Sequence, residues 1–134
     1  MMHPALQLWT IRHAAQKDLA NALLRAASIG YTAVEFAGLH GHSAGEVKCM
    51  LDEHGLRVCG AHIGFDFVAG DTAGVLEQAS ALGCPAVVIP SLPRTCWTPA
   101  LADRLNVLGQ SLAAEGVTLV LHNEADEFAP WQGS

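Results

Sequence analysis

Short apolar segments alternate with amphipathic segments along the chain, and a glycine marks most of the boundaries between them. The boundaries read ASIGYTAVEFAG, DEHGLRVCGAHIG, SALGCPAVVIP and AAEGVTLVLHN. Gly30, Gly55, Gly83 and Gly116 stand where a helix would end in a left-handed residue just before a strand. Their spacing of 25 to 33 residues is about that of one strand-and-helix unit.

The amphipathic segments repeat apolar residues every three or four positions, as Leu101, Leu105, Leu108 and Leu112 do, and this period predicts helices. The apolar segments are short and nearly continuous, which is typical of parallel strands covered on both faces. The predicted helices span residues 16–29, 43–54, 72–82 and 98–115, and the predicted strands span 5–10, 33–37, 57–63, 86–90 and 117–123.

Alternating strands and helices indicate an α/β protein with a parallel sheet and right-handed crossovers. We interpret residues 1–134 as a single domain made of these (βα) repeats. Two architectures fit. One is a half or truncated TIM barrel containing about five of its eight strands, since a whole barrel takes about 250 residues. The alternative is a flavodoxin-like doubly wound sheet. The periodicity alone does not separate them.

Composition narrows the function classes. Of the 134 residues, 51% are hydrophobic and 15% are charged, with a net charge of -6, which fits a globular chain and argues against nucleic acid or an anionic membrane as partner. No apolar run is long enough to cross a membrane, and no signal peptide is recognisable at the start of the sequence. The four cysteines form no CxxC pair, so we expect reduced thiols in a cytoplasmic protein. Without a GxGxxG or Walker pattern, we expect no nucleotide cofactor.

Polar residues gather at the predicted carboxyl ends of the strands, where ligands bind in either architecture. Glu35 lies inside the apolar segment AVEFAG, and a buried carboxylate needs a proton, a metal or a partner. His62 ends the next strand and could serve as proton shuttle, ligand or hydroxyl-binding group. The alternative for each residue is a structural role as a hydrogen-bonded core residue.

The last predicted strand ends in His122, Asn123 and Glu124, followed by Asp126 and Glu127. Because side chains two apart on a strand share a face, His122 and Glu124 should lie side by side. An imidazole next to a carboxylate suits Mn²⁺, Mg²⁺ or Zn²⁺, and it also suits sugar hydroxyls. A solvated end of a strand is the alternative.

Several segments, taken together and in order, resemble the sugar phosphate isomerase/epimerase family, the xylose isomerase-like TIM barrels. They are LQLWTIR, AASIGYTAVEFAGLHGHSAGEVKCMLDEHGLRVCGAHIGFD, ALGCPAVVIPSL and LNVLGQSLAAEGVTLVLHNEADEF. The resemblance covers residues 5–129. It implies a (β/α)₈ fold, a divalent metal at the carboxyl end of the barrel, and isomerisation or epimerisation of a sugar or related polyol next to a carbonyl. In such enzymes acidic residues exchange a proton with carbon while the metal polarises the oxygens.

By position, Glu35 and His62 match family residues that line the substrate pocket, and residues 122–124 match a segment that many members write HNHDFEF. This chain has Glu124 in place of the second histidine of that segment. The sequence also lacks the last three strands, which supply most of the family's metal ligands. The predicted site comprises catalytic Glu35, His62 and Glu124, substrate-binding Trp9, His122 and Asn123, and metal-binding His122 and Glu124.

Two function hypotheses follow. The first is an isomerase- or epimerase-like protein that carries out metal-assisted proton transfer on a sugar or polyol. The second is a catalytically inactive truncated barrel that acts as a binding or assembly module. Five strands of an open barrel would leave two unpaired sheet edges, so we also expect a homodimer. A flavodoxin-like regulatory domain is a third, weaker hypothesis because its phosphate-binding glycine loop is missing.

Overall fold

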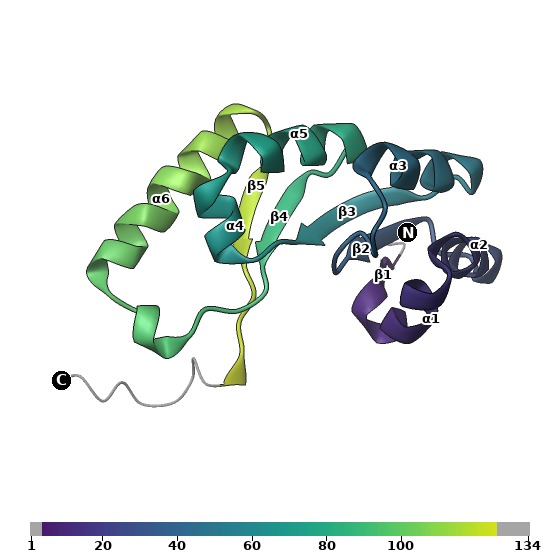
Figure 1. Cartoon of the computed structure of the whole chain (residues 1–134), viewed down its shortest axis with the longest axis horizontal. Helices are drawn as coiled ribbons and strands as arrows, with labels where there is room; N and C mark the ends of the chain where they lie inside the picture. The colour runs from purple at the N-terminus through teal and green to yellow at the C-terminus, as the bar shows by residue number, and fades with distance from the viewer. Residues whose placement is uncertain (1–3, 126–134) are drawn as a thin grey trace.

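Five parallel strands form one sheet, with the helices between them, in the computed structural model, which describes residues 4–125 (Figure 1). The strands are β1 (Leu6–Gln7), β2 (Ala33–Phe36), β3 (Arg57–His62), β4 (Ala86–Ile89) and β5 (Thr118–Leu121). They pair in chain order, β1-β2-β3-β4-β5. A flavodoxin-like sheet would place β1 between β2 and β3, so the doubly wound alternative is wrong. Sequential order with right-handed crossovers puts the helices on one face, as in a TIM barrel.

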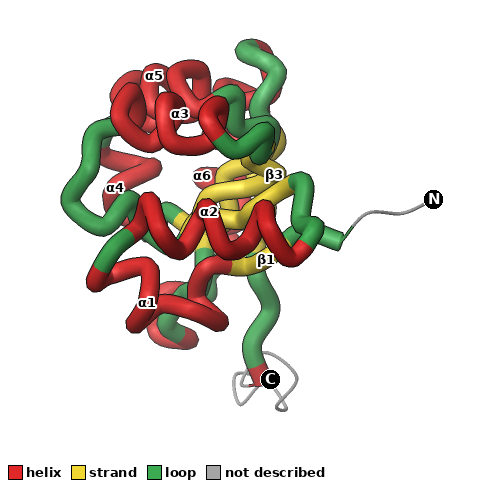
Figure 2. The backbone as a smooth tube through the Cα atoms, turned by 90° about the vertical axis from the view of Figure 1, so that its right-hand side faces the viewer, coloured by secondary structure: helices red, strands yellow, loops and turns green. Residues whose placement is uncertain are grey.

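The helices lie against one side of this sheet, and Figure 1 shows α3, α5 and α6 following one another along it. Figure 2 shows the same layering from the β1 end. The helices are α1 (Arg12–Lys17), α2 (Leu19–Ile29), α3 (Ala44–Glu53), α4 (Phe65–Gly70), α5 (Thr72–Leu82) and α6 (Pro99–Ala114), and two short 3₁₀ turns are η1 (Leu8–Ile11) and η2 (Arg94–Cys96).

Two predicted elements differ from the structure and one helix was not predicted, and at each of these places a side chain bonds to nearby backbone. The strand predicted at 5–10 stops at Gln7, whose side chain accepts the Trp9 N–H and starts η1. The helix predicted at 16–29 is interrupted at Asp18, which is extended and caps α2 by accepting the Asn21 N–H at 3.0 Å. Helix α4, which was not predicted, is separated from α5 by Asp71, the N-cap of α5.

The glycine boundaries behave as the sequence predicts. Gly30 and Gly83 end α2 and α5 with φ of 108° and 64°, a left-handed conformation that a side chain would strain. At the other end of a helix, Ser43 and Glu46 form a capping box at α3. The Ser43 N–H and hydroxyl both donate to the Glu46 carboxylate, at 2.7 and 2.8 Å, and these bonds lower the pKa of Glu46.

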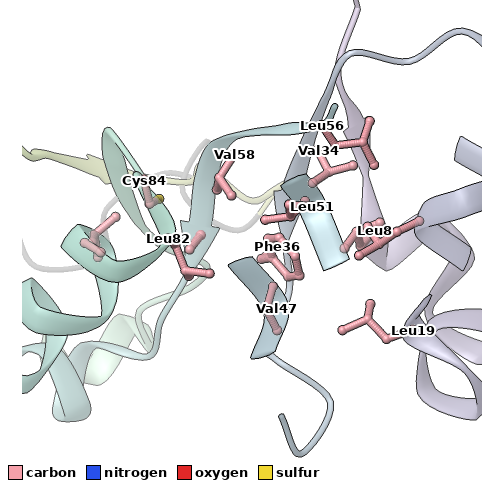
Figure 3. Close-up of a cluster of buried hydrophobic side chains, with 14 of the residues drawn as sticks. Leu8, Leu19, Val34, Phe36, Val47, Leu51, Leu56, Val58, Leu82 and Cys84 are labelled. Atoms are coloured by element: carbon pink, nitrogen blue, oxygen red, sulfur yellow. The ribbon is translucent and has the colours of Figure 1, made fainter. Parts of the chain in front are cut away.

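The hydrophobic core lies between the sheet and the helices (Figure 3). Val34 and Phe36 of β2 point into it and meet Val47 and Leu51 of α3, and all four side chains are at most 1% exposed. Burying each such side chain contributes about 1.5–3 kcal/mol. Cys84 packs in the same cluster, where burial raises the pKa of its thiol.

The other face of the sheet carries different side chains. Between β2 and β3 the register shifts after Val34, so that Glu35 pairs with Gly60 rather than with Cys59. A Cβ at Gly60 would lie 3.6 Å from both Glu35 Cγ and Val88 Cγ2, which places all three residues on the face opposite the core. In the described part of the chain, no helix is long and apolar enough to cross a membrane.

Candidate functional site

A cleft of about 610 Å³ opens at the carboxyl end of the sheet. Residues at or just beyond the ends of all five strands line it, as expected for the ligand-binding end of a parallel α/β sheet. The polar and aromatic side chains that line the cleft are those of Gln7, Trp9, His62, Ser91, His122 and Glu124. The cleft therefore contains four of the six predicted site residues.

Glu35 and His62 form a close pair beneath this cleft. Glu35 Oε1 contacts His62 Nε2, across neighbouring strands and 27 residues apart in sequence. The side chains are 29% and 12% exposed, respectively. His62 lines the cleft and Glu35 does not, so the imidazole is the member of the pair that meets the cleft. The structure thus brings together the two residues that the sequence placed on adjacent strands.

This contact bears on which imidazole nitrogen carries a proton. An ionised carboxylate only accepts hydrogen bonds, so beside an ionised Glu35 the donor is Nε2 of His62. In the neutral imidazole the other nitrogen, Nδ1, is then the base. A carboxylate that orients a histidine in this way is the usual support for general acid–base catalysis.

A second histidine–glutamate pair lies just beyond β5. His122 Nδ1 is 3.5 Å from Glu124 Oε1, and the side chains are 47% and 55% exposed. The two residues lie side by side as predicted, although β5 ends at Leu121 and both therefore follow the strand. His122 also meets His62 edge-on, with ring centroids 5.8 Å apart and an angle of 69° between the planes. The two pairs are thus neighbours across the cleft.

Trp9 forms an apolar wall of the cleft from η1 and is 59% exposed. Arg12 lies over its indole, 4.9 Å from the ring centroid, and donates from Nη1 to the Trp9 carbonyl at 3.0 Å. The arginine therefore holds the ring in place by a cation–π contact and a hydrogen bond. An exposed, fixed indole suits stacking on the C–H face of a sugar.

Asn123 stands apart from this site. Asn123 is exposed, and the described cleft does not include it among its lining. Asp126 and Glu127 lie outside the described residues. The sequence did not single out Gln7, which lines the cleft and also caps η1. The sequence signal that could have identified Gln7 is a polar residue at the end of an apolar strand, two positions before Trp9.

The metal predicted from the resemblance needs a set of donors, and the described residues supply only part of one. Between residues 4 and 125 there is no group of three or more His, Cys, Asp or Glu side chains arranged to hold an ion. His62 Nε2 is engaged by Glu35, which leaves His122 and Glu124 as one adjacent donor pair. The residues present do not fit a complete divalent-metal site, and metal binding stays a prediction.

Burial and the Glu35 carboxylate both affect the pKa of the Cys59 thiol. Its thiol donates to the Val34 carbonyl at 3.3 Å. Partial burial raises the pKa of the Cys59 thiol, and the nearby Glu35 carboxylate raises it further. This cysteine is therefore a protonated thiol at neutral pH rather than a nucleophile.

The fold is similar to that of solved xylose isomerase-like proteins. A sugar phosphate isomerase/epimerase from Parabacteroides distasonis matches 93% of this chain, with 23% identity and a TM-score of 0.73. A xylose isomerase domain containing protein from Salmonella typhimurium matches 90% with 16% identity and a TM-score of 0.68, and a probable 3-DHS dehydratase from Bacillus anthracis matches 90% with 10% identity and a TM-score of 0.64. This chain covers 50–52% of each of these proteins. No protein-family model and no curated protein matches.

These similarities confirm the predicted TIM-barrel type of fold. The strand order and the coverage agree, because the chain has five sequential parallel strands and spans about half the length of the solved structures it matches. At such low identities the likeness concerns the fold, and what those proteins do is not transferred by it.

Proposed function

We propose that this half barrel binds a sugar or polyol in the cleft and transfers a proton at the carbon next to a carbonyl, as a sugar isomerase or epimerase does. The observation that carries the proposal is the Glu35–His62 contact, which directs an oriented imidazole toward a cleft with an aromatic wall. The resemblance in sequence and in fold to sugar phosphate isomerase/epimerase proteins supports the same chemistry.

The proton transfer uses His62 Nδ1. This nitrogen removes the proton from the carbon adjacent to the carbonyl, and the electron pair of that C–H bond forms the carbon–carbon double bond of an enediolate. Glu35 stabilises the imidazolium that results, because its carboxylate accepts the Nε2–H. The π electron pair of the carbonyl moves onto its oxygen as the enediolate forms. Transfer of the hydroxyl proton to that oxygen, and return of the proton from His62 to the former carbonyl carbon, give the isomer with its carbonyl on the adjacent carbon. Delivery of a proton to the opposite face of the original carbon gives the epimer and requires a second acid, for which Glu124, another residue that lines the cleft, is the candidate.

Substrate contacts come from the remaining cleft residues. Trp9 would stack on the sugar ring, and His122 and Ser91 would bond to hydroxyl groups. A divalent ion, if bound, would polarise the substrate oxygens, and His122 with Glu124 would be the contribution of this chain to its coordination.

Assembly is part of the proposal. Within residues 4–125, β1 and β5 each pair with one neighbouring strand, and Val120 and Leu121 of β5 are 38% and 45% exposed. An unpaired strand with exposed apolar side chains favours association. We propose a homodimer that covers these edges. Light scattering after size exclusion tests it, with a mass of about twice 14.1 kDa expected and a single-chain mass contradicting it.

The test of function follows hydrogen exchange at carbon. The protein is incubated with D-xylulose or D-fructose in D₂O, and ¹H NMR measures deuterium incorporation next to the carbonyl, with and without added Mn²⁺ or Mg²⁺. Enzyme-dependent incorporation is expected, and His62→Asn should abolish it. Binding of these sugars without any exchange would instead favour the alternative function, a catalytically inactive binding module, and neither binding nor exchange would exclude both.

A further inference from the structure

The loop after β2 contains an unusual residue, His40. Its φ is 53°, and in the described part of the chain it is the one residue other than glycine with a positive φ. L-residues with a side chain are strained in this region, although histidine tolerates it better than most. Glycines with φ of 88° stand close on both sides, at Gly38 and Gly41.

The His40 imidazole is also unsatisfied. Its Nε2 is buried, and among the described residues it is the one buried side-chain nitrogen or oxygen with no hydrogen-bond partner. Buried polar atoms are nearly always paired, so each exception calls for a cause. Backbone strain and a missing hydrogen bond coincide at a single residue, and such features concentrate at binding and switching sites.

The loop connects directly to the cleft. Ala37 and Gly38 form part of its lining. At the far end the loop is fixed, since the His42 N–H donates to the Leu39 carbonyl at 3.0 Å and Ser43 begins the capping box of α3. The freedom left is therefore at Gly38 to Gly41, where the two glycines allow the backbone to rotate.

We infer that His40 is a further ligand-binding residue of this cleft, which turns on the two flanking glycines so that Nε2 forms a hydrogen bond with a hydroxyl group of a bound polyol. The inference rests on the proposed function for the class of ligand. A bound hydroxyl group would give Nε2 the hydrogen bond that it lacks. The cost of the strained backbone and of the unpaired nitrogen therefore favours the ligand-bound conformation. His40 binds and positions the sugar, whereas proton transfer belongs to His62.

Three variants of the full chain test this inference. In His40→Gly and His40→Asn the backbone strain is relieved and the buried nitrogen is removed, because glycine and asparagine both tolerate a positive φ. His42→Gln is the matched control, a second histidine from the same loop; neither His40 nor His42 is among the described residues that line the cleft, and of the two only His40 combines a positive φ with a buried Nε2 that lacks a partner. D-Xylulose is the probe, and its Kd is measured by calorimetry while Tm is measured without it.

Both His40 variants should raise Tm by about 3–6 °C, as expected for relieved strain in a chain of this size. They should also weaken D-xylulose binding by about tenfold, the effect of one lost hydrogen bond that leaves its partner unpaired. His42→Gln should leave Kd unchanged. In the wild type, the ring ¹H–¹³C signal of His40, assigned by its loss in His40→Asn, should shift on addition of D-xylulose.

An unchanged Kd in both His40 variants, or a Tm below that of the wild type, would overturn the role of His40 while leaving the proposed function intact. If the wild type itself failed to bind D-xylulose, the proposed function would fail and this inference with it. His40→Asn keeps a side chain in the loop, so a folding defect of the glycine variant does not decide the result.

Discussion

Two histidine–glutamate pairs face each other at the carboxyl end of the sheet, and they are built differently. Glu35 and His62 come from neighbouring strands, make a close contact, and are 29% and 12% exposed. His122 and Glu124 come from one segment, lie 3.5 Å apart, and are 47% and 55% exposed. The same two chemical groups are thus held in a sheltered position in one case and at the surface in the other.

The difference follows from the neighbours of each strand. β3 is paired on both sides, by β2 and by β4, whereas β5 pairs with β4 alone within the described residues. Shelter strengthens an ion pair or hydrogen bond because water competes less for it. A histidine–glutamate motif therefore becomes a preorganised acid–base pair only when adjacent strands enclose it, and the β5 pair would need a further neighbour to reach that state.

The largest expected effect is the loss of proton transfer on changing the enclosed pair. His62→Asn removes the base and should lower deuterium exchange into D-xylulose by about 10²–10⁴-fold, the usual contribution of a general base. His122→Asn is the matched change in the exposed pair and should cost about tenfold or less, as for one hydroxyl contact. Equal losses in both variants would remove the distinction between the pairs.

The next largest effect is on stability, and it compares the buried core beside β2 with the edge strand β5. Phe36→Ala opens a cavity in the core behind Glu35 and should lower the free energy of unfolding by about 3–5 kcal/mol. Leu121 is 45% exposed in the single chain, so Leu121→Ala should lower the free energy of unfolding by less than about 1 kcal/mol at protein concentrations too low for the proposed homodimer, and by more where that homodimer forms. Urea denaturation measures both. A large loss for Leu121→Ala would mean that the β5 edge is covered in solution, as the proposed homodimer requires.

Much of this arrangement could be predicted from the sequence, because short apolar strands and glycine-ended helices determine the order of the elements. The sequence also placed Glu35 and His62 on neighbouring strands, although the contact between their side chains was not itself predicted. Periodicity could not distinguish a barrel from a doubly wound sheet, since strand order depends on contacts between distant segments. It also missed the break at Asp18 and the early end of β1, where single side chains cap the backbone.

No pattern in the sequence predicts the conformation of His40. Its positive φ and buried Nε2 arise from how the loop packs between β2 and α3, and no pattern of residue types reports that packing. For the β5 pair the sequence left a solvated strand end as the alternative, because exposure depends on which strands lie beside β5 rather than on residues 122–124 themselves.

Double-mutant cycles measure a smaller effect, the coupling energy within each of the two histidine–glutamate pairs. Changing Glu35 to Gln and His62 to Asn, singly and together, should reveal a coupling energy of about 1–2 kcal/mol in the free energy of unfolding, as for groups in direct contact. The same cycle with Glu124→Gln and His122→Asn should give about 0.5 kcal/mol or less, because exposed pairs are screened by water. A stronger coupling in the exposed pair would contradict the role assigned to shelter.

The smallest effect uses Cys59 as a reporter of Glu35. Burial, and then the Glu35 carboxylate, raise the pKa of this thiol above the ordinary value of 9.0. The unfolded chain therefore loses the thiol proton first as pH rises, so the stabilisation is complete below about pH 9 and is lost as pH rises through the higher, folded-state pKa.

Glu35→Gln removes the carboxylate charge and should lower the pKa of the Cys59 thiol. The thiolate fraction then increases, and a disulfide reagent should modify Cys59 a few-fold faster at pH 8. Cys96, which like Cys59 is exposed, is the internal control and should react at an unchanged rate, as followed by mass spectrometry of the modified peptides. Equal acceleration of both cysteines would indicate general loosening of the fold rather than the loss of a charge beneath the cleft.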